Sequence, residues 1–137
     1  MLGRLGELFD AIEEEAQGFG VAIVASAVDA HGNTMLLMRM EGAPVHSIDL
    51  ATRKAFTAVD LGSDTLSLTP QAQPGGPLYG LTEATGGKLV MFGGGEVFEL
   101  APGVRIGVGI SGAPTEQDVA IVRNAIERVG ASHAAGS

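Results

Sequence analysis

The sequence contains no cysteine, and aromatic residues make up only 4% of its 137 residues. Without cysteine, the chain has no disulfide framework and no cysteine-ligated zinc or iron–sulfur site, which suits a reducing compartment. No stretch approaches the ~20 apolar residues of a membrane-spanning helix, and the segment after Met1 lacks the apolar core of a signal peptide. We therefore expect a cytoplasmic protein with no membrane partner.

Basic residues are also scarce. There are 8 Lys and Arg against 16 Asp and Glu, so the formal net charge is −8. A protein that neutralises nucleic-acid phosphates needs a basic surface, so we expect no nucleic-acid partner. The length suits one domain, which can bury enough surface to fold without a disulfide or a metal.

Glycine, by contrast, is abundant and unevenly placed. Of the 21 glycines, 13 lie between Gly62 and Gly112. Glycine allows tight turns and close approach of a ligand or another backbone. We therefore expect the function to lie in this part of the chain, together with the helix that precedes it.

Hydrophobic periodicity divides the chain into helices and strands. An apolar stripe predicts a helix over Arg4–Gln17. An apolar, β-branched run over Val21–Asp29 and a second expected strand over Thr34–Glu41 predict a hairpin around a His-Gly-Asn turn. The further expected elements are a helix over Ile48–Asp60 with Ser47 as its N-cap, a short turn capped at Ser63–Asp64, strands over Lys88–Phe92, Glu96–Leu100 and Val104–Ile110, and a last helix that starts at a Thr115–Asp118 capping box.

This order of elements predicts an α+β fold. Short turns between successive strands imply antiparallel pairing, so one antiparallel sheet of about five strands should carry the helices. We expect a single domain over residues 1–137, with residues 131–137 as a frayed tail.

Some motifs in the sequence have a structural explanation. Residues 107–112 read G-x-G-x-x-G, a dinucleotide-binding pattern, but too little chain follows to complete a βαβ unit. We therefore interpret the motif as a close-packed strand end. His31, His46 and His133 form no cluster, and the carboxylates lack zinc or calcium spacing, so we expect no metal site. Ser111 lies outside any nucleophile elbow, and we expect no serine nucleophile.

The segment Gln73–Gly80 differs from these motifs. It reads QPGGPLYG and contains the only tyrosine, Tyr79. Prolines from residue 70 to residue 77 exclude regular structure there. Long irregular loops in compact domains are usually functional, so we predict a functional or interface role for this one.

Several segments together resemble a known family. They are RMEGA (39–43), SIDLA (47–51), KAFTA (54–58), QPGGPLYG (73–80), GGKLVMFGGG (86–95), GVGISG (107–112) and EQD (116–118).

In this order the segments resemble the GlcG/HbpS family of haem-binding-like proteins, which is related to the C-terminal domain of PduO. The resemblance covers the chain from the hairpin to the last helix. It implies a profilin-like, three-layer α/β/α fold with a five-stranded antiparallel sheet, and a homo-oligomer. Some members bind haem or promote its degradation, and others are linked to glycolate or cobalamin metabolism.

Three functions stay open at this point. The first is a binding protein that holds haem, another tetrapyrrole or a similar apolar anion between the second helix and the Pro/Gly-rich loop. In it, Lys54 supplies charge for a carboxylate, and His46 or Tyr79 supplies an iron ligand or a hydrogen bond. The binding residues expected for this function are Arg39, His46, Lys54, Gln73, Pro74, Gly75, Gly76 and Tyr79.

The second function is a cofactor-free isomerase, lyase or cyclase for a small organic substrate. Its acid and base candidates are Glu41, His46, Tyr79 and Glu96, and it requires at least two of them in one pocket. The third is an oligomeric structural protein whose loop serves assembly.

Overall fold

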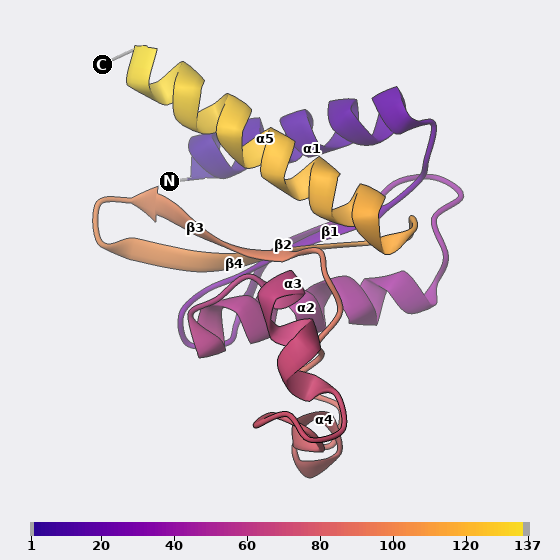
Figure 1. The fold of residues 1–137 in the computed structure, drawn as a ribbon. Helices are drawn as coiled ribbons and strands as arrows, with labels where there is room; N and C mark the ends of the chain where they lie inside the picture. Colours follow the sequence, from indigo (N-terminus) through magenta and orange to yellow (C-terminus); the bar gives the residue numbers. More distant parts are fainter. Residues whose placement is uncertain (1, 136–137) are drawn as a thin grey trace.

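The computed structural model describes residues 2–135 as an antiparallel sheet between two helical layers (Figure 1). The sheet has four strands in the order β2-β1-β4-β3. This bears out the mixed α+β fold and its antiparallel pairing. The elements are α1 (Leu2–Phe19), β1 (Val24–Val28), β2 (Thr34–Arg39), α2 (His46–Leu61), α3 (Thr65–Leu68), the 3-10 helix η1 (Thr69–Ala72), α4 (Leu81–Ala84), β3 (Gly95–Ala101), β4 (Val104–Ser111) and α5 (Thr115–Ala135).

The expected fifth strand, over Lys88–Phe92, is not present. This segment is extended but pairs with no strand. Side chains satisfy its backbone instead. The Val90 N–H donates to Thr57 Oγ1 at 3.0 Å, and the Met91 carbonyl accepts from Thr69 Oγ1 at 2.5 Å. The predicted strand is therefore wrong, and the middle of the segment, Leu89–Met91, is buried against helices instead.

One face of the sheet packs against α1 and α5 through large aliphatic side chains. Ile106, Val108 and Ile110 alternate along β4 and lie in the main apolar core. Leu8 and Ile12 of α1 join the same core and are fully buried. This layer resembles an ordinary core, in which an apolar stripe on each helix faces every second residue of a strand.

The other face packs against α2 through very small residues. Gly107 and Gly109 alternate with the aliphatic residues of β4, so they face α2. A Cβ at either glycine would collide with a backbone carbonyl of α2, that of Ala55 or of Ala51. The G-x-G-x-x-G sequence is therefore a close-packing feature of β4, as we interpreted it.

The chain between α2 and β3 forms short helices outside the sheet, visible at the bottom of Figure 1. Asp64 caps α3 as expected, with its carboxylate accepting from the Ser67 N–H at 2.9 Å. Thr69–Ala72 forms a 3-10 turn, so the proline-containing stretch starts with more regularity than predicted, since a proline fits the first turn of a helix. None of the described helices is long and apolar enough to cross a membrane.

Three helix ends differ from the sequence-based expectation. The N-cap of α2 is Val45, whose side chain makes no capping bond, so Ser47 is not the cap. In the proposed capping box, Asp118 accepts instead from the N–H of Ala113, at 3.1 Å. The last helix continues to Ala135, beyond the expected start of the tail at Ala131, and residues 136 and 137 lie outside the described residues.

Candidate functional site

Two hollows adjoin on the α2 side of the molecule and share the side chain of Phe92. The first, the His46 hollow, lies where α2 and α5 begin and has a volume of about 400 Å³. The second, the Tyr79 hollow, lies under the Pro/Gly-rich loop and has a volume of about 260 Å³. Phe92 lines both hollows and is 56% exposed. The two hollows therefore form a bipartite surface with an accessible aromatic ring at their junction.

The His46 hollow is lined by residues from three separate parts of the chain. They are Pro44, His46, Ser47, Leu50 and Lys54 around α2, Phe92 from the extended segment, and Ser111, Gly112, Ala113, Thr115 and Asp118 around the start of α5.

A buried ion pair lies in the lining of the His46 hollow. Lys54 Nζ lies 3.2 Å from Asp118 Oδ2 and donates to the Ile110 carbonyl at 2.8 Å. Burial lowers the pKa of Lys54 and raises the pKa of Asp118, while the opposite charge of each partner counteracts the shift. The pair joins α2 to α5 at the end of β4, in the lining of the hollow.

Glycine makes room for the Lys54 ammonium group. A Cβ at Gly94 would lie 3.0 Å from Lys54 Nζ, and the φ of Gly94 is +123°, a value that other residues rarely adopt. The carbonyl of Gly94 also accepts from the Ile110 N–H at 2.9 Å. The triple-glycine stretch therefore does more than connect two strands, because it passes directly over the buried lysine.

Two buried hydroxyl groups and one exposed imidazole complete the polar part of this hollow. Ser111 Oγ donates to Ser47 Oγ at 3.1 Å, and both residues are buried. His46, the first residue of α2, is exposed. The imidazole is thus accessible, whereas the serines lie deeper.

The Tyr79 hollow contains the predicted loop residues Gln73 and Tyr79. The loop is tightly folded on itself: the Gly76 N–H donates to the Gln73 carbonyl at 2.8 Å, and a Cβ at Gly76 would collide with the Gln71 carbonyl. Tyr79 is 66% exposed. Pro74 and Gly75 belong to the same loop but do not line the hollow. The loop therefore presents a phenol group beside Phe92.

Three predicted residues lie apart from both hollows. The Arg39 guanidinium donates to the Ala43 carbonyl at 3.3 Å, and Glu41 is exposed in the turn that follows β2. Glu96 lies on β3 and pairs with Arg123 at 3.2 Å, and burial raises its pKa. Neither carboxylate lines the His46 hollow or the Tyr79 hollow. The four acid and base candidates therefore do not converge, which favours a binding role over a cofactor-free enzyme.

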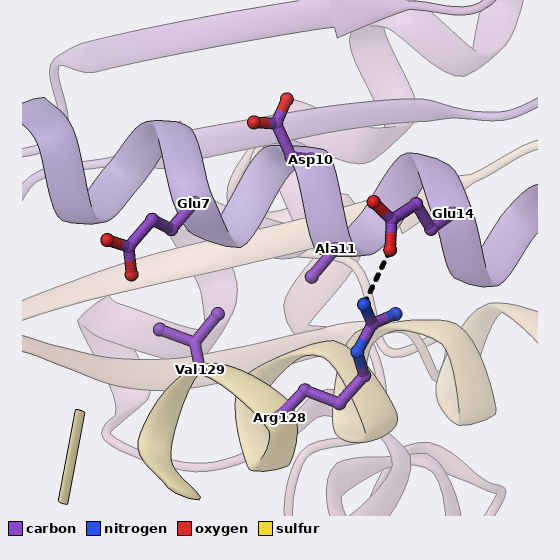
Figure 2. A pocket seen from close by; sticks show the side chains of 6 residues that line it. All are labelled: Glu7, Asp10, Ala11, Glu14, Arg128 and Val129. Carbon is purple, nitrogen blue, oxygen red and sulfur yellow. Dashed lines mark hydrogen bonds and ion pairs between the residues drawn. The ribbon is translucent and has the colours of Figure 1, made fainter. Parts of the chain in front are cut away.

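A third groove lies on the opposite side of the molecule, between α1 and α5. Figure 2 shows its residues, Glu7, Asp10, Ala11, Glu14, Arg128 and Val129. Glu14 pairs with Arg128 at 2.5 Å, whereas Glu7 and Asp10 point away from that pair. Among the side chains that the structure describes, those of residues 2–131, no three His, Cys, Asp or Glu side chains group in a way that could hold a metal ion.

Sequence reasoning named only His46 and Lys54 from the lining of the His46 hollow, and the residues that it missed include Phe92, Ser111, Thr115 and Asp118. Phe92 was assigned to a strand, Ser111 was considered only as a nucleophile, and Thr115 and Asp118 only as helix caps. The ion pair and the serine pair each join residues 64 positions apart, so no local pattern signals them. The one available signal was the placement of Lys54 on the face of α2 that otherwise buries small residues.

Comparison with known proteins gives a family match over nearly the whole chain. The family model described as "Haem degrading protein HbpS-like" matches residues 4–127. The corrinoid adenosyltransferase PduO of Salmonella typhimurium is 43% identical over 126 residues, which are 91% of this chain and 37% of PduO. This chain therefore corresponds to little more than a third of that relative's length.

Two further comparisons involve proteins of similar length. An uncharacterized 15.0 kDa protein of Citrobacter freundii, from the dhaT-dhaS intergenic region, is 39% identical over 92% of this chain and 89% of its own. The crystal structure of a complex of PduOC with haem has a TM-score of 0.88 and 41% identity, and the match covers 93% of this chain and 92% of that one.

Proposed function

The chain belongs to the HbpS-like family of haem-degrading proteins, and from this membership we propose that it binds haem or another tetrapyrrole across the His46 and Tyr79 hollows. The observation that carries the proposal is the shared position of Phe92 between the two hollows. A flat aromatic ring at the junction suits a large planar ligand that extends into both. The PduOC structure, a relative in complex with haem, supports this choice of ligand.

The residues at this surface fit the chemistry of haem. Haem iron needs an axial ligand, and histidine and tyrosine are both common in that role. His46 borders the first hollow and Tyr79 the second, and both side chains are accessible. Bound haem would supply an iron centre whose reactivity is set by its axial ligand and by the polarity around it.

Titration with hemin tests this proposal. We expect a shifted Soret band that saturates at one hemin per chain. His46→Ala should weaken binding about tenfold or more and alter the Soret position, because it removes the proposed axial ligand. Tyr79→Phe should have the smaller effect.

His31→Ala is the matched control, because His31 is also exposed but lies in the β1–β2 turn. An unperturbed Soret band at stoichiometric hemin would contradict the haem proposal. If His46→Ala, Tyr79→Phe and His31→Ala all bind as the original chain does, the proposed location is wrong.

We further propose that the chain forms a homo-oligomer through β2. This strand is at the edge of the sheet, and its residues Met35 and Leu37 are exposed apolar side chains. Exposed edges with apolar residues favour pairing with another chain. Sedimentation velocity should show an oligomer that Leu37→Lys dissociates, and a monomer at high protein concentration would contradict this.

A further inference from the structure

Two buried groups that line the His46 hollow, the Lys54 ammonium group and the Ser47–Ser111 pair, carry more hydrogen-bond donors than they use. A lysine ammonium group carries three N–H donors. Lys54 Nζ uses one on the Ile110 carbonyl and one on Asp118. Within residues 2–131, whose side chains the structure describes, the third donor forms no hydrogen bond, although Lys54 is only 2% exposed. A buried donor without an acceptor is unfavourable, so the hollow is incomplete without a ligand or water.

The serine pair has the same imbalance. Two hydroxyl groups carry two protons, but Ser47 and Ser111 form a single hydrogen bond with one another. Within the described part of the chain no acceptor is available for the second proton. Because hydroxyl groups rotate, the hydrogen bond can reverse so that Ser47 donates to Ser111, and the free proton is then that of Ser111, the less buried of the two. A second donor is thus free in the hollow, independently of Lys54.

The one carboxylate that lines the hollow is already engaged with donors of the protein. Asp118 Oδ2 accepts from Lys54 at 3.2 Å, and its Oδ1 accepts from the Ala113 N–H at 3.1 Å. The long helices α2 and α5 both begin at this hollow, with His46 and Thr115 as their first residues. Helix N-termini carry partial positive charge and favour anions, which strengthens the preference for an acceptor-rich group.

We propose that the His46 hollow binds the anionic oxygen atoms of a carboxylate, held by the Lys54 ammonium group and the Ser111 hydroxyl group. The remaining lining includes Pro44, Leu50 and Phe92, which suit an apolar body attached to that carboxylate. This inference rests on the proposed ligand-binding surface and adds the chemical class of the group that enters its deep end. A propionate of a tetrapyrrole and a small aromatic acid share this chemistry.

Sodium benzoate and benzyl alcohol test the inference on the whole chain. Both have the same ring, but only benzoate carries an anionic carboxylate. In amide NMR titrations we expect benzoate to shift the signals of Ser47, Ser111 and Thr115, and benzyl alcohol to shift them far less. Equal shifts from both compounds, or benzoate shifts confined to other parts of the molecule, would overturn the proposal.

Ser111→Ala removes one proposed donor and should weaken benzoate binding about tenfold, as expected for loss of a hydrogen bond to a charged group. Ser26→Ala is the matched control, because Ser26 is a buried strand serine whose hydroxyl group bonds to Thr52 outside the hollow. An unchanged benzoate affinity in Ser111→Ala would also overturn the proposal. The benzoate and benzyl alcohol comparison needs no variant, so it holds even if Ser111→Ala folds poorly.

Hemin and its dimethyl ester separate this inference from the proposed function. If a propionate enters the hollow, the ester should bind about tenfold more weakly, and Ser111→Ala should remove the difference. If the chain binds benzoate but not hemin, the carboxylate site is supported and the haem proposal is wrong. Hemin and its ester binding equally, with no benzoate binding, would retain haem and reject the carboxylate site.

Discussion

The two faces of the sheet differ in what they bury. Along β4, the residues that face α1 and α5 are Ile106, Val108 and Ile110, whereas those that face α2 are Gly107, Gly109 and Ser111. Most of the buried polar residues also lie on the α2 side: Ser26, Ser47, Lys54, Thr57, Thr65 and Ser111. One strand therefore serves an ordinary core on one side and a polar, closely packed layer on the other.

This difference suggests that the two faces have separate roles. Large apolar side chains supply most of the favourable free energy of folding, at about 25 cal/mol per Å² of apolar surface buried. Buried polar groups oppose folding unless they are paired, so their concentration on one face calls for another explanation. Both hollows that share Phe92 lie on that face, and we infer that ligand binding is the reason.

The largest effect expected on the polar face comes from breaking its buried ion pair. Lys54→Met leaves the Asp118 carboxylate buried without its counter-charge and should lower the free energy of unfolding by about 3–5 kcal/mol in urea denaturation. The double variant Lys54→Met/Asp118→Asn should recover much of that loss. Arg123→Met is the control, because its ion pairs are partly exposed, and it should cost less than about 1 kcal/mol. If Lys54→Met and Arg123→Met lower the free energy of unfolding by the same amount, the buried ion pair does not contribute more to stability than an exposed one.

The next effect compares the closely packed glycines on the α2 face of the sheet with the large side chains on the opposite face. Gly109→Ala adds one methyl group against the Ala51 carbonyl, and we expect a loss of about 3 kcal/mol. Leu8→Ala, which removes a large side chain from the opposite face, should cost a similar amount. Gly6→Ala is the control, because Gly6 lies within α1 and a Cβ there would meet no atom within 4 Å. This substitution should raise the free energy of unfolding by about 0.5–1 kcal/mol. A Gly109→Ala variant as stable as the original chain would show that α2 can shift away.

The alternation along β4 was predictable from the sequence, and so was the meaning of its glycines. Short-range patterns also gave the β1–β2 hairpin, where Asp29 accepts from the His31 and Asn33 N–H groups. Lys88–Phe92 was misread because an apolar run of that length fits a strand and a helix-packed segment equally well. The apolar pattern of the run agrees with the burial of Leu89–Met91, but it does not show which element packs against them.

For the candidate site, the prediction and the structure group the same residues differently. His46 and Lys54 were placed with Gln73 and Tyr79 in one pocket, whereas the structure separates them into two hollows joined by Phe92. Ser111 and Asp118 reach the first hollow only through tertiary packing. Such contacts depend on how α5 sits over the end of β4, which no local pattern records.

A smaller effect concerns the pH dependence of Glu96, a carboxylate whose pKa is raised by burial above its ordinary value of 4.5. Because the folded state binds this proton more tightly than the unfolded state, Glu96 stabilises the fold at low pH, and that contribution is lost as the pH rises above about 4.5 through the folded pKa. Urea denaturation across this range should show the original chain losing stability relative to Glu96→Gln.

Glu13→Gln is the control for this measurement, since Glu13 is exposed on α1. The difference in free energy of unfolding between Glu13→Gln and the original chain should stay nearly constant with pH. A stability difference for Glu96→Gln that grows in favour of the original chain as the pH rises would contradict the predicted sign.

The smallest expected effect on stability is that of two exposed phenylalanines, Phe92 and Phe19, which should differ in their effect on hemin binding. Phe92 is 56% exposed at the junction of the hollows, and Phe19 is 41% exposed at the end of α1. Because both rings are largely accessible, Phe92→Ala and Phe19→Ala should each change the free energy of unfolding by less than about 1 kcal/mol. Phe92→Ala alone should weaken hemin binding, by about tenfold, because a buried aromatic contact with the ligand is lost. If both variants lose hemin binding equally, the polar face is not specialised for the ligand. If both variants bind hemin as the original chain does, the ligand does not contact Phe92.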